Sequence, residues 1–287
     1  MSRPTARRRV VEWADGSLRA REDRVLTEEP LEIRVSAAGE PPRRFGVTMR
    51  TPGADFELAA GLLLAEGVVA GIDDLARVAY CTDETLRPDQ RFNVVTVDLT
   101  GPVRRSWVDR QARATSACGV CGTDSLDEVE ALAGRTASDR AHAAPAPPWD
   151  PALLAALPDR LRTRQQQFDR TGGAHAAGIF TDDTSTADSG TVVVREDVGR
   201  HNAVDKAVGY ALLNRVDVAG DALCTSGRVG FEIVQKAAVA GIGAVVGVGA
   251  PTTLAIDLAE RAAITLAAFA RDGRVVLHHV PQPAVAG

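Results

Sequence analysis

Apolar and polar positions alternate loosely along the first third of the chain, in the period typical of β-strands. One stretch, residues 56–64, instead places its apolar side chains at helical spacing. We therefore expect the first half to be a small α+β unit, preceded by a charged segment over residues 1–24 that we expect to be a frayed tail. The predicted strands of this half are 25–35, 45–49, 77–81 and 92–99.

From residue 171 onward, short apolar strands alternate with amphipathic helices. Such alternation indicates a layered α/β domain with a largely parallel core sheet. Asn202 is the expected cap of the first of these helices, with Asp205 three residues further on. A long helix is expected to open at residues 251–253 and to continue as far as Phe269. The predicted strands are 174–180, 192–195, 222–225, 242–248 and 274–280.

An Ala- and Pro-rich stretch over residues 141–151 separates the two halves and is typical of a linker. The 287 residues are enough for one large domain or two modest ones. We expect an N-terminal α+β domain over 25–140, which includes a cysteine-bearing loop, and a C-terminal α/β domain over 152–287.

Composition and charge exclude several classes of function. Hydrophobic residues make up 45% and charged residues 25%, as in ordinary globular proteins, and the net charge of −5 argues against binding to nucleic acid. No apolar run is long enough to span a membrane, and the basic N-terminus lacks the apolar core of a secretory signal. Four cysteines do not suggest a disulfide scaffold. We expect a cytoplasmic protein with reduced thiols and with no membrane or nucleic-acid partner.

Two thiols, Cys118 and Cys121, stand three residues apart in a polar stretch with glycine at positions 119 and 122. Few apolar side chains and two glycines indicate a mobile loop. Nearby cations such as Arg110 and Arg113 would raise the fraction of reactive thiolate. The pair could exchange as dithiol and disulfide, supply half of a zinc site, or carry sulfur as a persulfide.

The zinc hypothesis is weak, because a structural zinc ion requires four ligands and no second cysteine pair is present. Cys81 and Cys224 stand alone and are expected in the core. His278 and His279 are adjacent on a predicted strand, where their side chains point to opposite faces. A thioredoxin-like function is also disfavoured, since that motif begins a helix after a strand. We expect no permanently bound metal.

Four further polar stretches follow or precede predicted strands: 171–175, 195–202, 225–228 and 247–253. Loops at one edge of an α/β sheet are where ligands usually bind, and helix N-termini there favour anions. We therefore expect a crevice at this edge. The candidate ligand-contacting residues are His175, Arg200, His201, Ser226 and Arg228.

Together these stretches resemble the formate dehydrogenase accessory sulfurtransferase family, in an order that covers about residues 25–280. No single matching stretch is specific for the family, but their joint occurrence in this order is specific. The matching pieces are Ala60-Gly61 with Glu66-Gly67, Cys118 to Gly122, Thr171 to His175, Glu196 to Asn202 with Asp205-Lys206, Thr225 to Arg228, Glu232 to Lys236, and Thr252 to Ala255 with Ala259-Glu260.

The resemblance implies a sulfurtransferase that is both a sulfur carrier and a molybdenum-cofactor chaperone. Cys118 would accept sulfur from a cysteine desulfurase as a persulfide, with Cys121 assisting the relay. The sulfur would pass to the molybdenum cofactor, in its bis-molybdopterin guanine dinucleotide form, before insertion into apo formate dehydrogenase. The resemblance also implies a C-terminal three-layer αβα domain similar to the cytidine-deaminase fold, and a homodimer.

In that family the nucleotide of the cofactor is associated with the segment after the predicted long helix. Its arginines suit phosphates, because a guanidinium group pairs with them through two hydrogen bonds. The matching residues here are Phe269, Ala270, Arg271, Asp272, Gly273 and Arg274.

This chain departs from the family pattern at two positions: Ala117 stands where relatives often have Gly, and Ala270 where some have a further Cys. Deaminase chemistry is not implied, because the chain lacks the Pro-Cys-x-x-Cys run that holds a catalytic zinc. The alternative hypothesis is a non-catalytic chaperone that binds the cofactor and docks on formate dehydrogenase.

Overall fold

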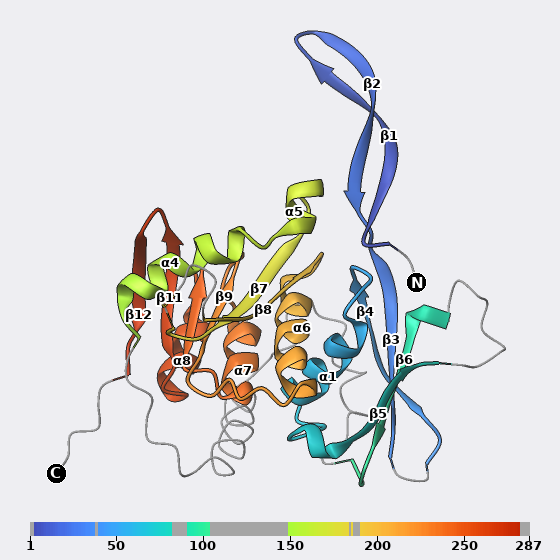
Figure 1. Ribbon diagram of the computed structural model, residues 1–287, viewed down its shortest axis with the longest axis vertical. Helices are drawn as coiled ribbons and strands as arrows, with labels where there is room; N and C mark the ends of the chain where they lie inside the picture. The colour runs from blue at the N-terminus through green and yellow to red at the C-terminus, as the bar shows by residue number, and fades with distance from the viewer. Residues whose placement is uncertain are drawn as a thin grey trace.

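The computed structural model describes residues 3–37, 40–81, 91–103, 149–183, 185 and 190–281. Cys118 and Cys121 lie outside the described residues, as does most of the predicted linker. The described chain forms a projecting two-stranded arm, a four-stranded sheet and a six-stranded sheet (Figure 1).

The arm consists of β1 (Thr5–Ala14) and β2 (Ser17–Leu26), which pair antiparallel over their whole length. Its turn is Asp15-Gly16, with φ of 49° and 73°. Two residues with positive φ match the right-handed twist of the flanking strands, and Asp-Gly is a strong signal for this turn. The frayed tail expected over residues 1–24 is therefore wrong for residues 5–24.

The four-stranded sheet has the order β4-β3-β6-β5. Alternate residues of β3 point to the core and are almost fully buried, as the period of two requires. They pack with α1 in one apolar cluster, so the strands and helix predicted for this half are present. The elements are β3 (Glu29–Ser36), β4 (Arg43–Arg50), α1 (Asp55–Ala65), η1 (Ile72–Asp74), β5 (Leu75–Tyr80), η2 (Arg91–Asn93) and β6 (Val94–Leu99).

The six-stranded sheet has the order β12-β11-β10-β9-β7-β8 and is mixed. Only β9, β10 and β11 run parallel; β7 is antiparallel to both its neighbours, and β12 to β11. The largely parallel sheet expected from the sequence is wrong, because two hairpins, β7–β8 and β11–β12, flank the parallel centre. The strands are β7 (His175–Phe180), β8 (Thr191–Asp197), β9 (Ala222–Thr225), β10 (Ala244–Gly247), β11 (Thr265–Arg271) and β12 (Arg274–His279).

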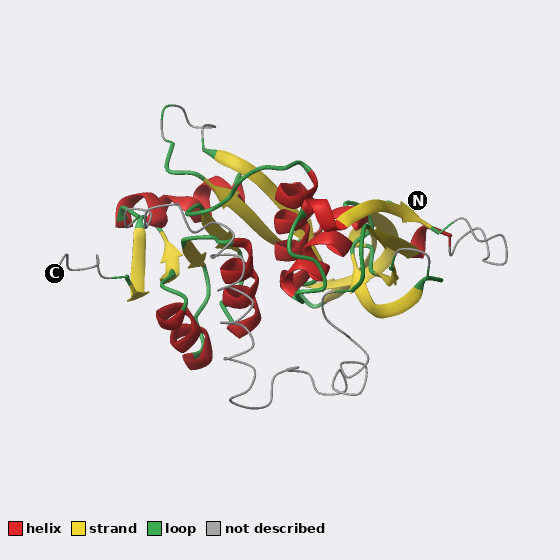
Figure 2. Cartoon of the chain, turned by 90° about the horizontal axis from the view of Figure 1, so that it is seen from below, coloured by secondary structure: helices red, strands yellow, loops and turns green. Residues whose placement is uncertain are grey.

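Helices cover both faces of this sheet and make three layers (Figure 2). Alternate strand residues such as Ile179 and Leu223 pack towards α6, α7 and α8, whereas Phe180 and Cys224 pack towards α4. The short α5 stands at one end of β7. The helices are α4 (Pro151–Arg162), α5 (Gln166–Thr171), α6 (Arg200–Leu213), α7 (Phe231–Ala240) and α8 (Thr253–Arg261).

The long helix expected to reach Phe269 is wrong, since α8 ends at Arg261 and β11 begins at Thr265. Residues 264–268 are all at most 4% exposed, because helices lie on both faces of β11. A strand buried on both sides carries a continuous apolar run, and such a run cannot be told from a buried helix by its period.

The two sheets are joined through helices α1 and α6. Gly61 of α1 and Gly209 of α6 lie at their crossing, where each lacks a side chain that would overlap the backbone of the other helix. The apolar cluster continues from the four-stranded sheet through these helices into the six-stranded sheet. The predicted domains therefore share one core.

Candidate functional site

Five loops meet at one edge of the six-stranded sheet. Strands β8, β9, β10 and β11 end at this edge, and β7, which is antiparallel to β9, begins there. The polar stretches identified in the sequence are therefore neighbours in space, as expected.

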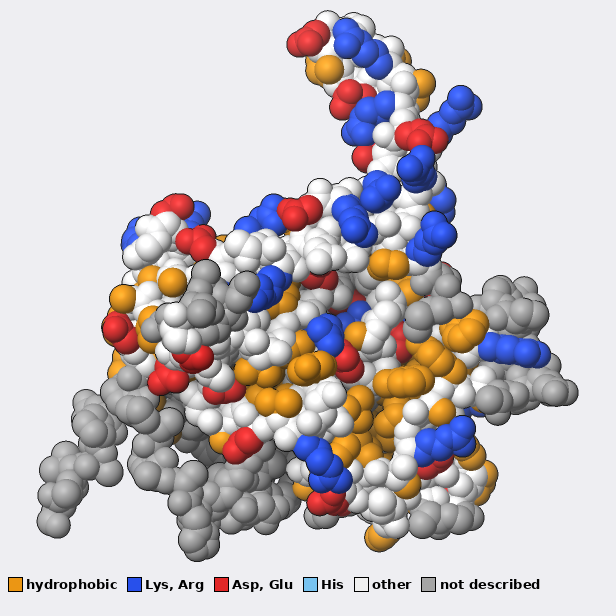
Figure 3. Space-filling view, in the orientation of Figure 1, with side chains coloured by type: hydrophobic (Ala, Val, Ile, Leu, Met, Phe, Trp, Pro, Cys, Tyr) orange, Lys and Arg blue, Asp and Glu red, His pale blue; other side chains and the backbone are white. Residues whose placement is uncertain are grey.

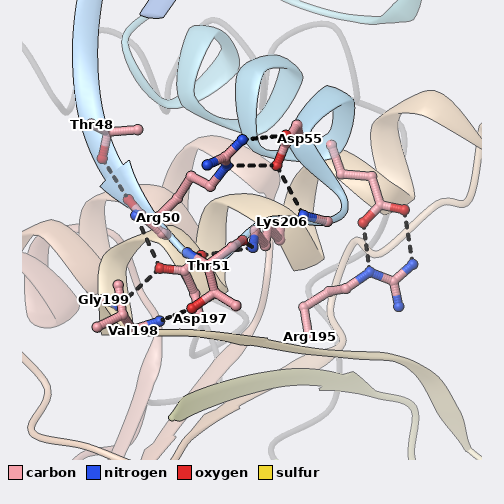
Figure 4. A network of polar contacts seen from close by, with 12 residues as sticks. Thr48, Arg50, Thr51, Asp55, Arg195, Asp197, Val198, Gly199 and Lys206 are labelled. Atoms are coloured by element: carbon pink, nitrogen blue, oxygen red, sulfur yellow. Dashed lines mark hydrogen bonds and ion pairs between the residues drawn. The ribbon is translucent and has the colours of Figure 1, made fainter. Parts of the chain in front are cut away.

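Asp197, the last residue of β8, ties this edge to the N-terminal half (Figure 4). Its carboxylate accepts the backbone N–H groups of Thr51 (3.0 Å) and Gly199 (2.9 Å) and contacts Lys206 Nζ at 2.7 Å. Lys206 Nζ also donates to the Thr51 carbonyl at 2.8 Å. Asp197 and Lys206 are both almost fully buried, so each neutralises a charge that water cannot reach.

The prediction that Asn202 caps α6 is wrong, because the helix begins two residues before Asn202, at Arg200. Its amide nitrogen instead donates to the Met49 carbonyl (2.7 Å) and to Asp197 Oδ1 (3.1 Å), and its oxygen accepts from Thr48 Oγ1 at 3.1 Å. Asn202 therefore fixes the first turn of α6, which carries Arg200 and His201, against β4.

Glu196 orders the other side of the site. Its carboxylate accepts the backbone N–H groups of Gln167 (2.7 Å) and Phe168 (2.8 Å) at the start of α5. The helix ends at Gly172, whose φ of 65° turns the chain into β7. This turn places His175 at the edge of the sheet.

His175, Ser226 and Arg200 form the centre of the site. Ser226 Oγ lies 3.5 Å from His175 Nδ1 and accepts the N–H of Ala176 at 2.9 Å. Gly227 lies beside both the Arg200 side chain and the His175 ring: a Cβ there would lie 3.4 Å from Arg200 Cδ and 3.5 Å from His175 Nδ1. Burial and then the charge of Arg200 lower the pKa of His175, while Asp197 opposes the shift. The imidazole is therefore neutral at pH 7.

Arg200 Nε is buried and has no hydrogen-bond partner among the described residues. A buried guanidinium N–H without an acceptor is costly, so it favours an anionic ligand that supplies one. His175, Ser226 and the Gly227 backbone lie around it.

His201 faces the next helix. Its Nε2 lies 3.5 Å from Glu232 Oε2, and behind them Lys236 Nζ contacts Asp205 Oδ1 at 2.7 Å. Burial is the largest cause that lowers the pKa of His201 to about 4, and the attraction of Glu232 does not offset it. His201 is therefore a neutral hydrogen-bonding group at pH 7.

The far half of the edge carries Arg228, Gly249 and Phe269. Gly249 lies against Arg228, where a Cβ would be 3.0 Å from the Arg228 backbone, and its carbonyl accepts the Phe269 N–H at 3.3 Å. Phe269 has a φ of 52° and is 40% exposed, so a bulge in β11 presents its ring at the surface.

Of the remaining predicted nucleotide-binding residues, Ala270 is fully buried under α4. Its side chain therefore cannot contact a ligand at this edge. The other four, Arg271, Asp272, Gly273 and Arg274, form the exposed tip of the β11–β12 hairpin. Both arginines are available there to an anion.

Cys224 is fully buried in β9, and burial raises the pKa of its thiol. Cys81, which was also expected in the core, is only partly buried, so that prediction is wrong. In the described part of the chain, no three His, Cys, Asp or Glu side chains are grouped to hold a metal ion. Over the same residues, every helix is too short or too polar to cross a bilayer.

The predictions from the sequence did not assign a structural role to the polar residues that hold the site in place. Asp197, Lys206, Glu232 and Lys236 belong to recognised motifs, but the predicted roles went to their neighbours. A signal was present: Asp205, Lys206 and Lys236 lie on the apolar faces of predicted helices, and buried charges require partners.

Known proteins resemble this chain over nearly its whole length. A sequence model of the FdhD/NarQ family matches residues 26–283. The sulfur carrier protein FdhD of Streptomyces coelicolor is 46% identical over 274 residues, which cover 94% of this chain and 92% of the relative. The sulfur carrier protein FdhD of Mycobacterium tuberculosis is 43% identical over 282 residues, 94% of this chain and 95% of the relative.

A crystal structure from Desulfotalea psychrophila, of a protein described as a formate dehydrogenase accessory protein, has a similar fold. The TM-score is 0.71 at 22% sequence identity, and the match covers 97% of this chain and 98% of the other.

Proposed function

The chain belongs to the FdhD/NarQ family, which confirms the resemblance seen in its motifs, and we propose that it is a sulfur carrier for the maturation of formate dehydrogenase. The relatives named sulfur carrier protein FdhD support this proposal. The structural observation that carries it lies at the sheet edge, where Arg200 Nε has no hydrogen-bond partner among the described residues and His175, Ser226 and Gly227 lie beside Arg200.

Cys118 carries the sulfur in this proposal. Its thiolate attacks the outer sulfur of a persulfide on a cysteine desulfurase. The sulfur–sulfur bond of the donor breaks, the donor cysteine leaves as a thiolate, and Cys118 holds the persulfide. No net oxidation or reduction occurs in this step.

Release of the sulfur as hydrosulfide requires two electrons, which come from oxidation of Cys118 and Cys121 to a disulfide. Its thiolate attacks the inner sulfur of the Cys118 persulfide, a disulfide forms between the two cysteines, and the terminal sulfur leaves as hydrosulfide. The two cysteines are oxidised while the transferred sulfur is reduced. A cellular dithiol then restores both thiols for the next cycle.

The acceptor substrate in this proposal is the molybdenum cofactor in its bis-molybdopterin guanine dinucleotide form. The described residues fit an anion of this kind, because the edge carries the guanidinium groups of Arg200, Arg228, Arg271 and Arg274, and Arg200 Nε has no hydrogen-bond partner among the described residues. Arg200 and Arg228 would contact phosphate near the centre. Phe269, with Arg271 and Arg274 beside it, would contact the nucleotide end.

Several finer expectations stay predictions. These are a cytoplasmic location, the cytidine-deaminase likeness of the C-terminal layers, the domain limits, the homodimer, the cysteine desulfurase donor and apo formate dehydrogenase as the recipient. The location follows from the cysteine content, the domain limits follow from the Ala- and Pro-rich stretch, and the others follow from the family resemblance.

The test is mass spectrometry of the intact chain after incubation with a cysteine desulfurase and cysteine. We expect a gain of one sulfur atom, mapped to Cys118 and lost in Cys118→Ser. Cys81→Ser is the matched control, since Cys81 is a partly exposed thiol outside the motif, and it should retain the gain. A chain that gains no sulfur, or gains it only at Cys81, contradicts the proposal.

A double variant, Cys118→Ala with Cys121→Ala, separates sulfur transfer from simple binding. We expect it to bind the cofactor but to leave formate dehydrogenase inactive. Full maturation of the enzyme by this variant would favour the alternative, a non-catalytic cofactor-binding chaperone.

A further inference from the structure

Glu232, in the first turn of α7, is a carboxylate at the site that no cation neutralises among the described residues. Helix α7 begins at Phe231, directly after the loop 226–230, so its first turn lies at the same sheet edge as that loop. In the described part of the chain the Glu232 carboxylate has one polar contact, His201 Nε2, which lies 3.5 Å from its Oε2. The Glu232 side chain is 38% exposed, so its oxygens are accessible to a ligand.

The two basic residues nearest to Glu232 do not balance its charge. His201 is uncharged at pH 7, because burial lowers its pKa to about 4. Lys236 follows four residues later on the same helix, the spacing at which Glu–Lys pairs form on a helix surface. Its Nζ instead contacts Asp205 at 2.7 Å, and both of these side chains are buried. The negative charge of Glu232 is therefore left for another partner.

The other carboxylates near the centre of the site are already bound. They are Asp197, which contacts Lys206, Asp205, which contacts Lys236, and Glu196, which accepts two backbone N–H groups. Each of these contacts holds one element against another. Glu232 has no such structural contact, since the ring of His201 is a weak and uncharged neighbour at 3.5 Å.

The surroundings of Glu232 otherwise suit an anion. Lysine and arginine side chains are frequent on the side of the body from which α5 and the arm rise (Figure 3), and Arg200 and Arg228 lie at the site itself. A carboxylate in such a place repels the phosphates of a ligand and attracts its N–H groups. Two carboxylate oxygens accept two parallel N–H bonds, and bonds of this charged kind are strong and directional.

We infer that Glu232 recognises the 2-amino-4-oxopyrimidine edge of the ligand, where its two oxygens accept the ring N–H and the adjacent amino N–H. Pterin and guanine both carry this edge, and both are parts of the cofactor in the proposed function, on which this inference rests. Adenine lacks the ring N–H and hypoxanthine lacks the amino group, so neither base supplies both donors. Glu232 is thus a specificity-determining residue.

Arg200 and Glu232 together orient the ligand. The guanidinium group attracts phosphate, whereas the carboxylate repels phosphate and accepts from the heterocycle. A ligand bound in the reverse direction would place like charges together, which is costly. The opposite charges of these two residues therefore select one direction of binding.

Two matched pairs of probes test the inference, because the members of each pair differ only in the 2-amino group. The pairs are GDP with IDP, and 6-carboxypterin with the same pteridine lacking its amino group. We expect the full wild-type chain to bind the amino member of one pair at least about tenfold more tightly, as the loss of a charged hydrogen bond predicts. A preference within the GDP pair assigns guanine, and a preference within the pteridine pair assigns pterin.

The variant Glu232→Gln should reduce this preference to about twofold or less, because the amide has one acceptor oxygen and its NH₂ group faces a donor. Its affinity for the member without the amino group should stay as in the wild type. That result separates recognition from the general stabilisation that an acidic residue gives to the first turn of a helix. Glu260→Gln is the matched control, since Glu260 is exposed at the other end of α8, and it should keep the full preference.

The sulfur gain at Cys118, measured on the same Glu232→Gln preparation, should equal that of the wild type. Absence of the sulfur gain in both chains would contradict the proposed function, whereas the ligand pairs decide this inference alone. The inference would be overturned by a wild-type chain that binds neither pair or shows no preference. A preference that persists in Glu232→Gln, or an equal loss of both members of a pair, would overturn it as well.

Discussion

At the scale of single residues, Asp197 makes the most important contacts. One carboxylate binds the Thr51 and Gly199 backbone and the buried Lys206, so it joins the N-terminal half to the site. We expect Asp197→Asn to cost about 3–5 kcal/mol of unfolding free energy, because Lys206 is left buried without a counter-charge. Urea denaturation measures this loss.

The matched control is Asp73→Asn. Asp73 also pairs with a cation, Arg215 at 3.0 Å, but both side chains are mostly exposed. Exposed pairs contribute little, so we expect a change within about 0.5 kcal/mol. Equal losses in both variants would show that burial does not determine the effect.

At the scale of elements, the crossing of α1 and α6 is the tightest contact between the two halves. We expect Gly209→Ala to destabilise the protein, because a methyl group there overlaps the Glu57 carbonyl of α1. Overpacking of a rigid contact costs about 3 kcal/mol, which exceeds the gain of about 1 kcal/mol in helix propensity. The urea midpoint should fall accordingly.

Gly46→Ala serves as its control, since a Cβ at Gly46 meets nothing within 4 Å. This variant should be as stable as the wild type or slightly more so, because alanine restricts the unfolded chain. If Gly209→Ala were as harmless as Gly46→Ala, the helices would have to separate without cost, contrary to the close crossing.

At the scale of the whole molecule, the two predicted domains share one apolar core. Leu31 of the four-stranded sheet, Leu58 of α1, Val204 of α6 and Leu223 of the six-stranded sheet belong to the same cluster. We expect a single cooperative transition in calorimetry, with equal calorimetric and van't Hoff enthalpies per unfolding unit. Two separate transitions would mean that each half is stable without the other.

The local pattern of the sequence was enough to predict most strands and the sheet edge at which the polar loops meet. Strand β9 was predicted with its observed bounds, and the polar loops after β8, β9 and β10 meet as expected. Steric rules also fix the turn at Asp15-Gly16, a signal present in the sequence that our prediction of a tail overlooked. Such features depend on neighbours along the chain.

Only the tertiary structure decided what depends on distant neighbours. The run at residues 264–268 became strand β11 because helices cover both its faces, and Asn202 became a bridge to β4 because the start of α6 lies beside that strand. The sequence by itself determined the family, since its motifs rest on local order, and it supplied the candidate site residues, which stay predictions. Which polar groups meet, as Asp197 and Lys206 both meet the Thr51 backbone, follows from packing between segments about 150 residues apart.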